Sequence, residues 1–430
     1  MSRYRIIIRA FTLRRDIASS VILARLLERA GAQVIIASGR DFTRLLRNWN
    51  PDAILINTVG QIKRCAELAP NASIILWPGE GAQPLPSSDA TQLAQWPEAY
   101  ERLSLALLWG PRNLDYFAQT MPHHDRSKLV MCGNPRLDMV KFNPDLLNVE
   151  KKTIGFIGRF HSLNRYNSVP AIFSLQYPEK RNGVVWQVES FITMITLIHR
   201  IINETDLLIS IRPHPLEAPE GYEFFNEGPF EGRVEIDNSF DVADWTARQR
   251  VIITPSSQSF YESYVLGTPT IQMDQLSKTS DMIRQITPFA AMSQLVGYQP
   301  ESYDEAIELI AHDPSVPPIQ NDEVDVHLDE FHDWSSNTSS IARAEGAIMA
   351  HLANRKRPRG KAVPKALMQL WDRISFARVH KRDPLHQNFN YHESYHVIPD
   401  YYENVVNNII NGRSVYEAHT SKPITQPSAT

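Results

Sequence analysis

The fold is indicated by the stretch RIIIR at Arg5–Arg9 and by the residues that directly follow it. This run of β-branched side chains predicts a short buried strand. Asp16 is expected to cap an amphipathic helix that continues to Ala30, and Gly31 ends this helix. Residues 33–38, QVIIAS, predict a second strand. Short continuous apolar strands that alternate with helices are typical of a parallel sheet with helices on both faces.

The same alternation continues beyond the second strand. A short helix is predicted at 42–49 and stops before Asn50-Pro51, because a residue that precedes proline disfavours the helical conformation. A polar segment at 143–152, with Asn, Pro, Asp and paired Lys, ends this part of the chain. Further short apolar strands are predicted at 53–57, 73–77, 105–109 and 128–132.

A second alternating α/β unit follows the polar segment. Its predicted strands are residues 153–157, 207–211, 251–254 and 269–273, and its predicted helices are residues 188–203 and 259–266. The alternation weakens after residue 312, where helices are predicted at 338–354 and 366–379. The chain is therefore expected to contain two parallel α/β units and a helical C-terminal part.

Length and charge bound the class of protein. The 430 residues suit two or three domains. The 44 Lys and Arg against 48 Asp and Glu give a formal net charge of −4, which argues against a strongly cationic nucleic-acid-binding protein. We predict Rossmann-like domains at 1–148 and 149–335, a helical segment at 336–420 that packs back on the first domain, and a disordered tail at 421–430.

The cysteines and the apolar segments indicate the compartment. Cys65 and Cys132 cannot form a disulfide framework and lack a metal-ligand spacing, so buried thiols in a reducing compartment are expected. The apolar run near the N-terminus is too short for a signal peptide, and no stretch reaches the roughly 20 apolar residues of a spanning helix. We expect a cytoplasmic protein, either soluble or held at the inner membrane by the basic run at 355–361.

The sharpest local motif is LLISIRPHP at 207–215, a strand that enters a turn fixed by two prolines. Proline fixes its own φ and restricts the residue before it, so Arg212 and His214 are held at the carboxyl end of the strand. A permanent cation beside an imidazole suits a phosphate group. The alternative is a structural turn with an exposed histidine.

A second candidate for phosphate binding is TPSSQS at 254–259, which follows a strand and opens a helix. The hydroxyls of Ser256, Ser257 and Ser259 and the free N–H groups of a helix N-terminus can bind an anion. Ordinary N-capping by one serine is the alternative. Glu262 lies one turn into this helix, where a carboxylate can accept hydrogen bonds from a ribose.

Two loops of the first domain carry candidate catalytic carboxylates. WPGEGA at 77–82 places Glu80 between glycines that allow close approach of a substrate, as a general base for a hydroxyl. A helix-capping or solvated acid is the alternative. CGNPRLD at 132–138 places Arg136 and Asp138 after a strand, where they either pair with each other or leave Asp138 as a nucleophile or electrostatic stabiliser.

The second unit opens with GFIGRFHSLN at 155–164, which contains neither a Walker-A lysine motif nor a three-glycine Rossmann fingerprint. Gly158 permits close approach to a ligand, and Arg159 or His161 is placed to face it. Glu189 lies near the predicted start of the long helix, where it acts either as a capping acid or as a catalytic one.

One acidic and histidine-rich stretch has the composition of a metal site. It has no recognised ligand spacing, and we predict no bound metal. The residues are Asp325, His327, Asp329, His332 and Asp333.

These motifs together resemble those of bacterial surface-carbohydrate biosynthesis proteins, which are GT-B glycosyltransferases of capsule or O-antigen synthesis. The resemblance covers roughly residues 50–275 and implies two Rossmann-like domains that face each other across a cleft, with C-terminal helices. It also implies transfer of a sugar to a glycan or lipid-linked acceptor in surface polysaccharide or lipopolysaccharide assembly. The shared elements are, in order, Glu80-Gly81, Trp109-Gly110, GNPRLD at 133–138, RPHP at 212–215 and residues 241–270.

The motif set is also similar to that of retaining β-Kdo transferases and bacterial sialyltransferases, which have an acidic-acidic-Gly motif, a His-Pro motif and a serine motif. Here Gly79 stands in place of the first acid. The resemblance implies Glu80 as base, and His214 with Ser256 or Ser257 on the phosphate of a CMP-sugar, with Kdo ahead of sialic acid. No metal or cofactor is implied, because only one phosphate leaves and side chains can neutralise it.

The sequence leaves the stereochemistry, the donor and the class of activity open. An inverting enzyme needs only the base, whereas a retaining double displacement also needs a carboxylate nucleophile, for which Asp138 is the candidate. A CDP-activated alcohol such as glycerol phosphate is a second donor, as in teichoic-acid polymerases. Two further hypotheses are an inactive GT-B-like subunit that binds a glycan or partner, and a UDP-sugar epimerase.

Overall fold

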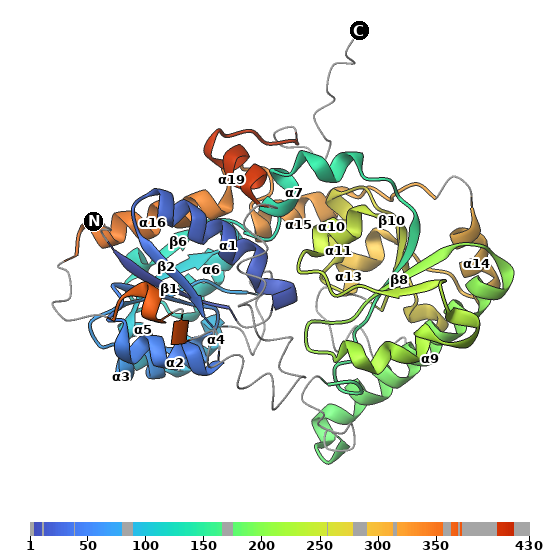
Figure 1. Cartoon of the computed structure of the whole chain (residues 1–430), viewed down its shortest axis with the longest axis horizontal. Coiled ribbons are helices and arrows are strands. Elements are labelled where there is room, and N and C mark those ends of the chain that lie inside the picture. Colours follow the sequence, from blue (N-terminus) through green and yellow to red (C-terminus); the bar gives the residue numbers. More distant parts are fainter. Residues whose placement is uncertain are drawn as a thin grey trace, which may run out of the picture. The chain divides into compact units, whose positions relative to one another are not determined.

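The chain folds into two compact units, each with its own parallel sheet (Figure 1). Unit 1 comprises Met1–Asn143 and His327–Thr430, and unit 2 comprises Pro144–Val326. The sequence placed the corresponding boundaries at 148/149 and 335/336. The computed structural model describes residues 4–10, 13–37, 39–79, 89–165, 175–255, 257–277, 290–312, 316–355, 363–368, 370–371 and 402–416.

The sheet of unit 1 has six parallel strands in the order β2-β1-β3-β4-β5-β6. All six lie where the sequence predicts a strand. Ile6, Ile7 and Ile8 of β1 are buried, as a central strand requires when helices cover both faces of a sheet. The strands are β1 (Arg5–Arg9), β2 (Gln33–Ala37), β3 (Ala53–Ile56), β4 (Ser73–Leu76), β5 (Leu103–Leu108) and β6 (Leu129–Met131).

The first helix of unit 1 begins earlier than predicted. Because α1 starts at Leu13, Asp16 lies within its first turn and is not the N-cap. Gly31 follows the helix with a φ of +90°, a conformation that glycine adopts without strain, which confirms the predicted stop. The helices are α1 (Leu13–Arg29), α2 (Gly39–Asn48), α3 (Ile62–Leu68), α4 (Asp89–Gln95), α5 (Pro97–Arg102), α6 (Pro111–Thr120) and α7 (Asp138–Lys141).

C-terminal helices complete unit 1. Figure 1 shows α16 (Ser340–Ala353) beside α1, and α19 (Glu403–Ile410) also contacts α1. Arg29 at the end of α1 donates to Glu403 and to Asn407 of α19. The helix α15 (Asp322–His332) crosses the division between the units. Most of the helix predicted at 366–379, and all of the tail at 421–430, lie outside the described residues.

The sheet of unit 2 also has six parallel strands, in the order β12-β11-β10-β7-β8-β9. The two edge strands, β9 (Val234–Ile236) and β12 (Gly297–Tyr298), are short and were not predicted. The predicted strands are β7 (Thr153–Ile157), β8 (Leu208–Arg212), β10 (Gln249–Thr254) and β11 (Thr270–Gln272). The helices are α9 (Pro178–Glu204), α10 (Val242–Ala247), α11 (Phe260–Val265), α13 (Ala290–Leu295) and α14 (Tyr303–Ala311).

The longest helix, α9, is a core helix of unit 2. Its stretch Lys180–Glu204 is long and apolar enough to cross a membrane by length and composition alone. Met194, Leu197 and Ile198 are nevertheless fully buried against the strands of unit 2. This packing accounts for the buried face of the helix, whereas Val185, Val188 and Ile192 of the same helix are exposed.

Both cysteines are buried, as predicted. Burial raises the pKa of the Cys65 and Cys132 thiols to about 12 each. A thiol with this pKa holds almost no thiolate at neutral pH, so neither cysteine has the character of a nucleophile.

Candidate functional site

The donor-site residues predicted from the sequence gather at one edge of the unit 2 sheet. Strand β7 pairs in parallel with β10 on one side and with β8 on the other. The loops that leave the carboxyl ends of these three strands are therefore neighbours. They carry Ser257 and Ser259 after β10, Gly158 to His161 after β7, and His214 after β8. Open α/β sheets bind ligands at this edge.

The imidazole of His214 is fixed by the turn that follows β8. Its Nδ1 accepts a hydrogen bond of 3.1 Å from the Leu216 N–H. An Nδ1 that accepts carries no proton, so the proton of the neutral ring is on Nε2. The ring of His161 lies with its centroid 5.1 Å from that of His214 and is tilted by 36°. The structure thus brings together two histidines that the sequence placed on different loops.

A buried carboxylate that the sequence did not single out ties these two loops together. Glu217 is fully buried, and its Oε1 accepts a hydrogen bond of 2.5 Å from the Phe160 N–H. Its Oε2 accepts from the Tyr222 hydroxyl. Nothing in the local sequence marks Glu217, because its partner Phe160 lies 57 residues away.

Gly158 is required by this internal packing. A Cβ atom at Gly158 would lie 2.9 Å from Tyr222 Oη and 3.0 Å from Glu217 Oε2. The atoms on the side of Gly158 where a Cβ would lie therefore belong to the protein, and the approach of a ligand to Gly158 stays a prediction.

Arg212 has a structural role that the sequence did not predict. Its buried guanidinium donates from Nη1 to Asp237 Oδ1 at 2.5 Å and to Ser239 Oγ at 2.9 Å, and from Nη2 to the Ser239 carbonyl at 2.9 Å. The guanidinium carbon also lies 5.9 Å from the centroid of the Trp245 ring. These contacts hold the chain that follows β9, and the contact of Arg212 with a phosphate stays a prediction.

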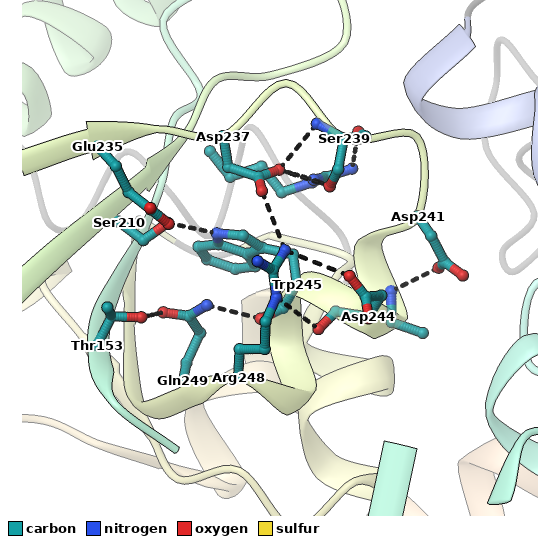
Figure 2. A network of polar contacts seen from close by, with 12 residues as sticks. Thr153, Ser210, Glu235, Asp237, Ser239, Asp241, Asp244, Trp245, Arg248 and Gln249 are labelled. Carbon is teal, nitrogen blue, oxygen red and sulfur yellow. Dashed lines mark hydrogen bonds and ion pairs between the residues drawn. The ribbon is translucent and has the colours of Figure 1, made fainter. Parts of the chain in front are cut away.

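The surrounding polar network braces this arrangement (Figure 2). Trp245 Nε1 donates to Ser210 Oγ at 2.9 Å, and Ser210 Oγ donates to Glu235 at 2.8 Å. Arg248 pairs with Asp237 and Asp244 at 3.2 and 3.3 Å. The contacts join β8, β9 and α10, so the turn that carries His214 starts from a rigid base.

Asp241 caps α10 and gives this network a pH dependence. Its Oδ1 accepts from the Ala243 N–H at 2.9 Å, and burial raises the pKa of its carboxyl to about 6. Because this pKa exceeds the ordinary value of 3.8, the protonated carboxyl stabilises the folded state. This stabilisation is fully present below about pH 4 and is lost as the pH rises through about 6.

We expect Asp241→Asn to remove this pH dependence while it keeps the capping oxygen. Between pH 4 and pH 7 the native protein should lose at most about 3 kcal/mol more unfolding free energy than the variant does. Hydrogen exchange in α10, measured at increasing urea concentrations and at each pH, gives the difference in unfolding free energy. Asp244→Asn is the matched control, and equal pH profiles for native protein and Asp241→Asn would contradict the assignment.

The other donor-side candidates have varied surroundings. Ser257 Oγ accepts from the Ser259 N–H at 3.3 Å, which forms a local turn before α11, and Ser256 lies outside the described residues. Glu262 is buried in α11. Arg159 packs with its guanidinium carbon 5.3 Å from the centroid of the Trp186 ring.

Glu189 does not lie at a helix N-terminus. The helix α9 begins at Pro178, ten residues before its predicted start, so Glu189 is about three turns inside the helix. The dipole effect is confined to the first turn, and the predicted anion stabilisation at Glu189 was wrong for this reason.

In unit 1, Asp138 caps a helix. Its carboxylate accepts from Ser339 Oγ at 2.6 Å and from the backbone N–H groups of Ser340 and Ile341 at 3.1 and 2.8 Å. The side chain is buried, and this burial raises the pKa of the carboxyl. These contacts place Asp138 at the start of α16, and its role as a nucleophile stays a prediction.

Of the two remaining candidates in unit 1, the structure describes Arg136 but not Glu80. The Arg136 N–H bonds to Asn134 Oδ1 at 3.0 Å, and its side chain lines a pocket of unit 1. Glu80 lies outside the described residues, although Pro78 and Gly79 line the same pocket.

The acidic and histidine-rich stretch is divided among separate partners. Asp325 accepts from the Tyr264 hydroxyl, Asp329 from the Ser335 N–H and Asp333 from Arg343, whereas His332 bonds to Asn134 and His327 stacks on Phe331. Within the described ranges, no three His, Cys, Asp or Glu side chains are placed to hold a metal ion.

Neither a protein-family model nor a curated protein matches the chain, but solved structures do. A variant of the wall teichoic acid polymerase TagF is 13% identical over 81% of this chain and 89% of that one, with a TM-score of 0.52. The S. aureus MnaA structure with UDP is 13% identical over 84% and 100%, with a TM-score of 0.45. UDP-GlcNAc 2-epimerase from Neisseria meningitidis, bound to UDP-GlcNAc, is 11% identical over 82% and 100%, with a TM-score of 0.44. Such identities concern the fold alone. The similarity to the polymerase and the two six-stranded parallel sheets confirm the predicted GT-B fold with two Rossmann-like units.

Proposed function

We propose that the chain is a glycosyltransferase of bacterial surface polysaccharide assembly and that unit 2 binds its nucleotide-sugar donor. The observation that carries this proposal is the pair of His161 and His214 at the carboxyl edge of the sheet. Because His214 Nδ1 accepts from the Leu216 N–H, its Nε2–H is the donor toward a ligand. A donor held on a rigid turn suits a phosphate oxygen.

The donor we propose is a CMP-sugar, with Kdo ahead of sialic acid. In the transfer, the acceptor hydroxyl oxygen bonds to the anomeric carbon while the bond from that carbon to the phosphate oxygen breaks. Glu80 takes the hydroxyl proton as general base. His214 and Ser257, with Ser256 as the neighbouring hydroxyl, donate hydrogen bonds to the single phosphate that leaves with CMP, so no metal ion is needed for its charge. Arg212 is left out of this site because three of its five N–H groups donate to Asp237 and Ser239 inside unit 2.

A thermal-shift panel of CMP, CDP, UDP, GDP and ADP tests the donor. A ligand at about 100 times its Kd adds about 2.7 kcal/mol to the stability of the state it binds. Selective stabilisation by CMP is the expected result. Selective stabilisation by UDP would overturn the donor and favour a UDP-sugar epimerase, and no response to any nucleotide would favour an inactive GT-B-like subunit.

We expect His214→Asn to weaken CMP binding by roughly 10- to 100-fold, which corresponds to one lost hydrogen bond to a charged group. Asparagine keeps an acceptor for the Leu216 N–H, since its side chain forms the same type of turn, but it lacks the Nε2–H. The matched control is His312→Asn, an exposed histidine at the end of α14. Isothermal titration with CMP measures both variants, and an unchanged affinity in His214→Asn would overturn the assignment.

A CDP-activated alcohol is the second candidate donor. It is favoured by the similarity to the wall teichoic acid polymerase, whose TM-score of 0.52 exceeds that of the other two structures described above. Such a donor would transfer a phosphoryl alcohol and release CMP. Stabilisation by CDP rather than CMP in the panel, followed by analysis of the product for a new phosphodiester, would establish this candidate.

We further propose that the acceptor is a glycan or lipid-linked glycan at the cytoplasmic face of the inner membrane. The basic run at 355–361 is the proposed membrane contact. Of this run the structure describes only Arg355, which donates to Ser73 Oγ at 2.6 Å. Flotation of the full chain with vesicles that contain anionic lipid tests this association.

A further inference from the structure

Unit 1 contains a pocket of its own at the carboxyl edge of its sheet. The pocket is lined by residues from the ends of β1 and β3, from the chain that follows β4, β5 and β6, and from α1. About 20 Å³ of it is accessible to the centre of a water molecule, and the roughly 390 Å³ of atom-free space counted at its mouth includes open solvent. Among its lining residues are three arginines, one aspartate and two tryptophans, and these determine what it can bind.

The charge of the pocket lining is positive. Among the lining residues that the structure describes, Arg9, Arg15 and Arg136 contribute three positive charges and Asp16 contributes one negative charge, which leaves 3 − 1 = +2. Asp16 is already engaged, because its Oδ1 accepts from Arg15 Nε at 2.9 Å and its Oδ2 accepts from Asn57 Nδ2 at 3.1 Å. An excess of guanidinium groups in a half-enclosed pocket favours an anionic ligand.

The charged groups are held in fixed positions. Arg9 Nη1 donates to Asn57 Oδ1 at 2.5 Å, so Arg9, Asn57, Asp16 and Arg15 form one continuous chain of hydrogen bonds. A site whose side chains are ordered beforehand loses less conformational entropy when its ligand binds. The hydrogen bonds therefore preorganise the polar side chains of this pocket for a ligand.

The two tryptophans provide an independent indication of a ligand. Trp77 and Trp109 are buried and line the pocket, with exposed fractions of 8% and 2%. The buried Trp109 Nε1–H has no hydrogen-bond acceptor among the residues that the structure describes. A buried donor without an acceptor is unfavourable, and a hydroxyl or carboxylate oxygen of a ligand would satisfy it.

We propose that this pocket binds an anionic sugar, whose carboxylate or phosphate pairs with the arginines and whose oxygen accepts from Trp109 Nε1–H. Gly79 lines the pocket and directly precedes Glu80 in the sequence. Under the proposed function the bound sugar thus belongs to the acceptor, and this last identification rests on that function. The binding itself requires only unit 1.

Titration of the ¹⁵N-labelled full chain tests the proposal through the indole N–H signals. The signal of Trp109 is identified by its loss in Trp109→Phe, which keeps an aromatic ring but removes the N–H. The probes are glucuronate, glucose 1-phosphate, glucose and inorganic phosphate. We expect a charged sugar to shift the Trp109 signal at about one tenth of the concentration that glucose needs, or less. A shift with glucuronate indicates that the pocket binds a carboxylate, and a shift with glucose 1-phosphate indicates that it binds a phosphate.

Arg136→Met provides the second variant. It should weaken binding of the charged sugar by about tenfold and leave glucose binding unchanged. Three results would overturn the proposal: equal binding of glucose and the charged sugars, binding of inorganic phosphate as tight as that of glucose 1-phosphate, or no shift of Trp109 with any probe. None of the probes contains a nucleotide. If no probe binds but CMP still binds, the proposed pocket ligand is wrong and the proposed donor site in unit 2 is unaffected.

Discussion

Replacement of Asp138 by alanine is expected to lower the unfolding free energy of unit 1 by about 3–5 kcal/mol. The carboxylate accepts three hydrogen bonds, from Ser339 Oγ and from the N–H groups of Ser340 and Ile341, and it lies in the interior. Alanine leaves these donors without an acceptor at the first turn of α16, where no other helix carbonyl can replace it.

Two further variants separate this structural role from a catalytic one. Asp138→Asn keeps one acceptor oxygen and should lose about half as much stability as Asp138→Ala. Ser339→Ala removes one donor and should lose about 1 kcal/mol. Hydrogen exchange in α16 with increasing urea measures each loss separately from unit 2. If Asp138→Ala instead abolished transfer but changed exchange in α16 by less than about 1 kcal/mol, the nucleophile role would be restored.

Replacement of Arg212 by methionine is expected to destabilise unit 2 by about 3–5 kcal/mol. The guanidinium pairs with Asp237 in the interior, and both side chains are less than 10% exposed. Among the residues that the structure describes, removal of the cation leaves the buried Asp237 carboxylate with side-chain or N–H contacts to Arg248 and Ser239. Desolvation lowers the pKa of Arg212, and the nearby carboxylates of Asp237 and Asp241 oppose this effect, so the ion pair is needed to keep the charge in place.

The double variant Arg212→Met with Asp237→Asn tests the pairing directly. Loss of both charges should cost less than the sum of the single changes by at least about 1 kcal/mol, because neither partner is then left buried and charged. Asparagine still offers an oxygen to the Ser239 N–H. Hydrogen exchange in β8 and β9 reports the stability of unit 2. Additive effects, or loss of CMP affinity at unchanged stability in Arg212→Met, would instead place Arg212 on the ligand.

The strands could be predicted from sequence wherever helices cover both sides of the sheet. Interior strands such as β1 and β10 each contain an uninterrupted run of three apolar β-branched residues, which is a clear signal. The two missed strands are the edges of the unit 2 sheet. The edge strand β9 has only three residues, and its central Glu235 is exposed, so neither length nor hydropathy identifies it.

The sequence could predict that the candidate residues lie together at one edge of the sheet, but it could not predict the contacts of each side chain. Residues that follow neighbouring parallel strands meet at one edge, and for this reason His161 and His214 were found together. The side-chain contacts depend on partners distant in the sequence. Asp138 meets Ser339 after 201 residues, and Arg212 meets Asp237 after 25. No periodicity or spacing shows such contacts, so the sequence could not predict that Asp138 and Arg212 have partners within the protein.

The discontinuity of unit 1 has a consequence for how the chain is made. Residues up to Asn143 leave the ribosome long before the segment that begins at His327 and contains α16. At about 5–20 residues per second, synthesis of the intervening unit 2 takes roughly 10–40 seconds. During this interval the helix that Asp138 caps has not been synthesised, and α1 has no contact with α16. Nascent unit 1 thus has its sheet and its first helices but lacks its C-terminal helices, whereas unit 2 is a continuous segment whose sheet is complete as soon as it has been synthesised.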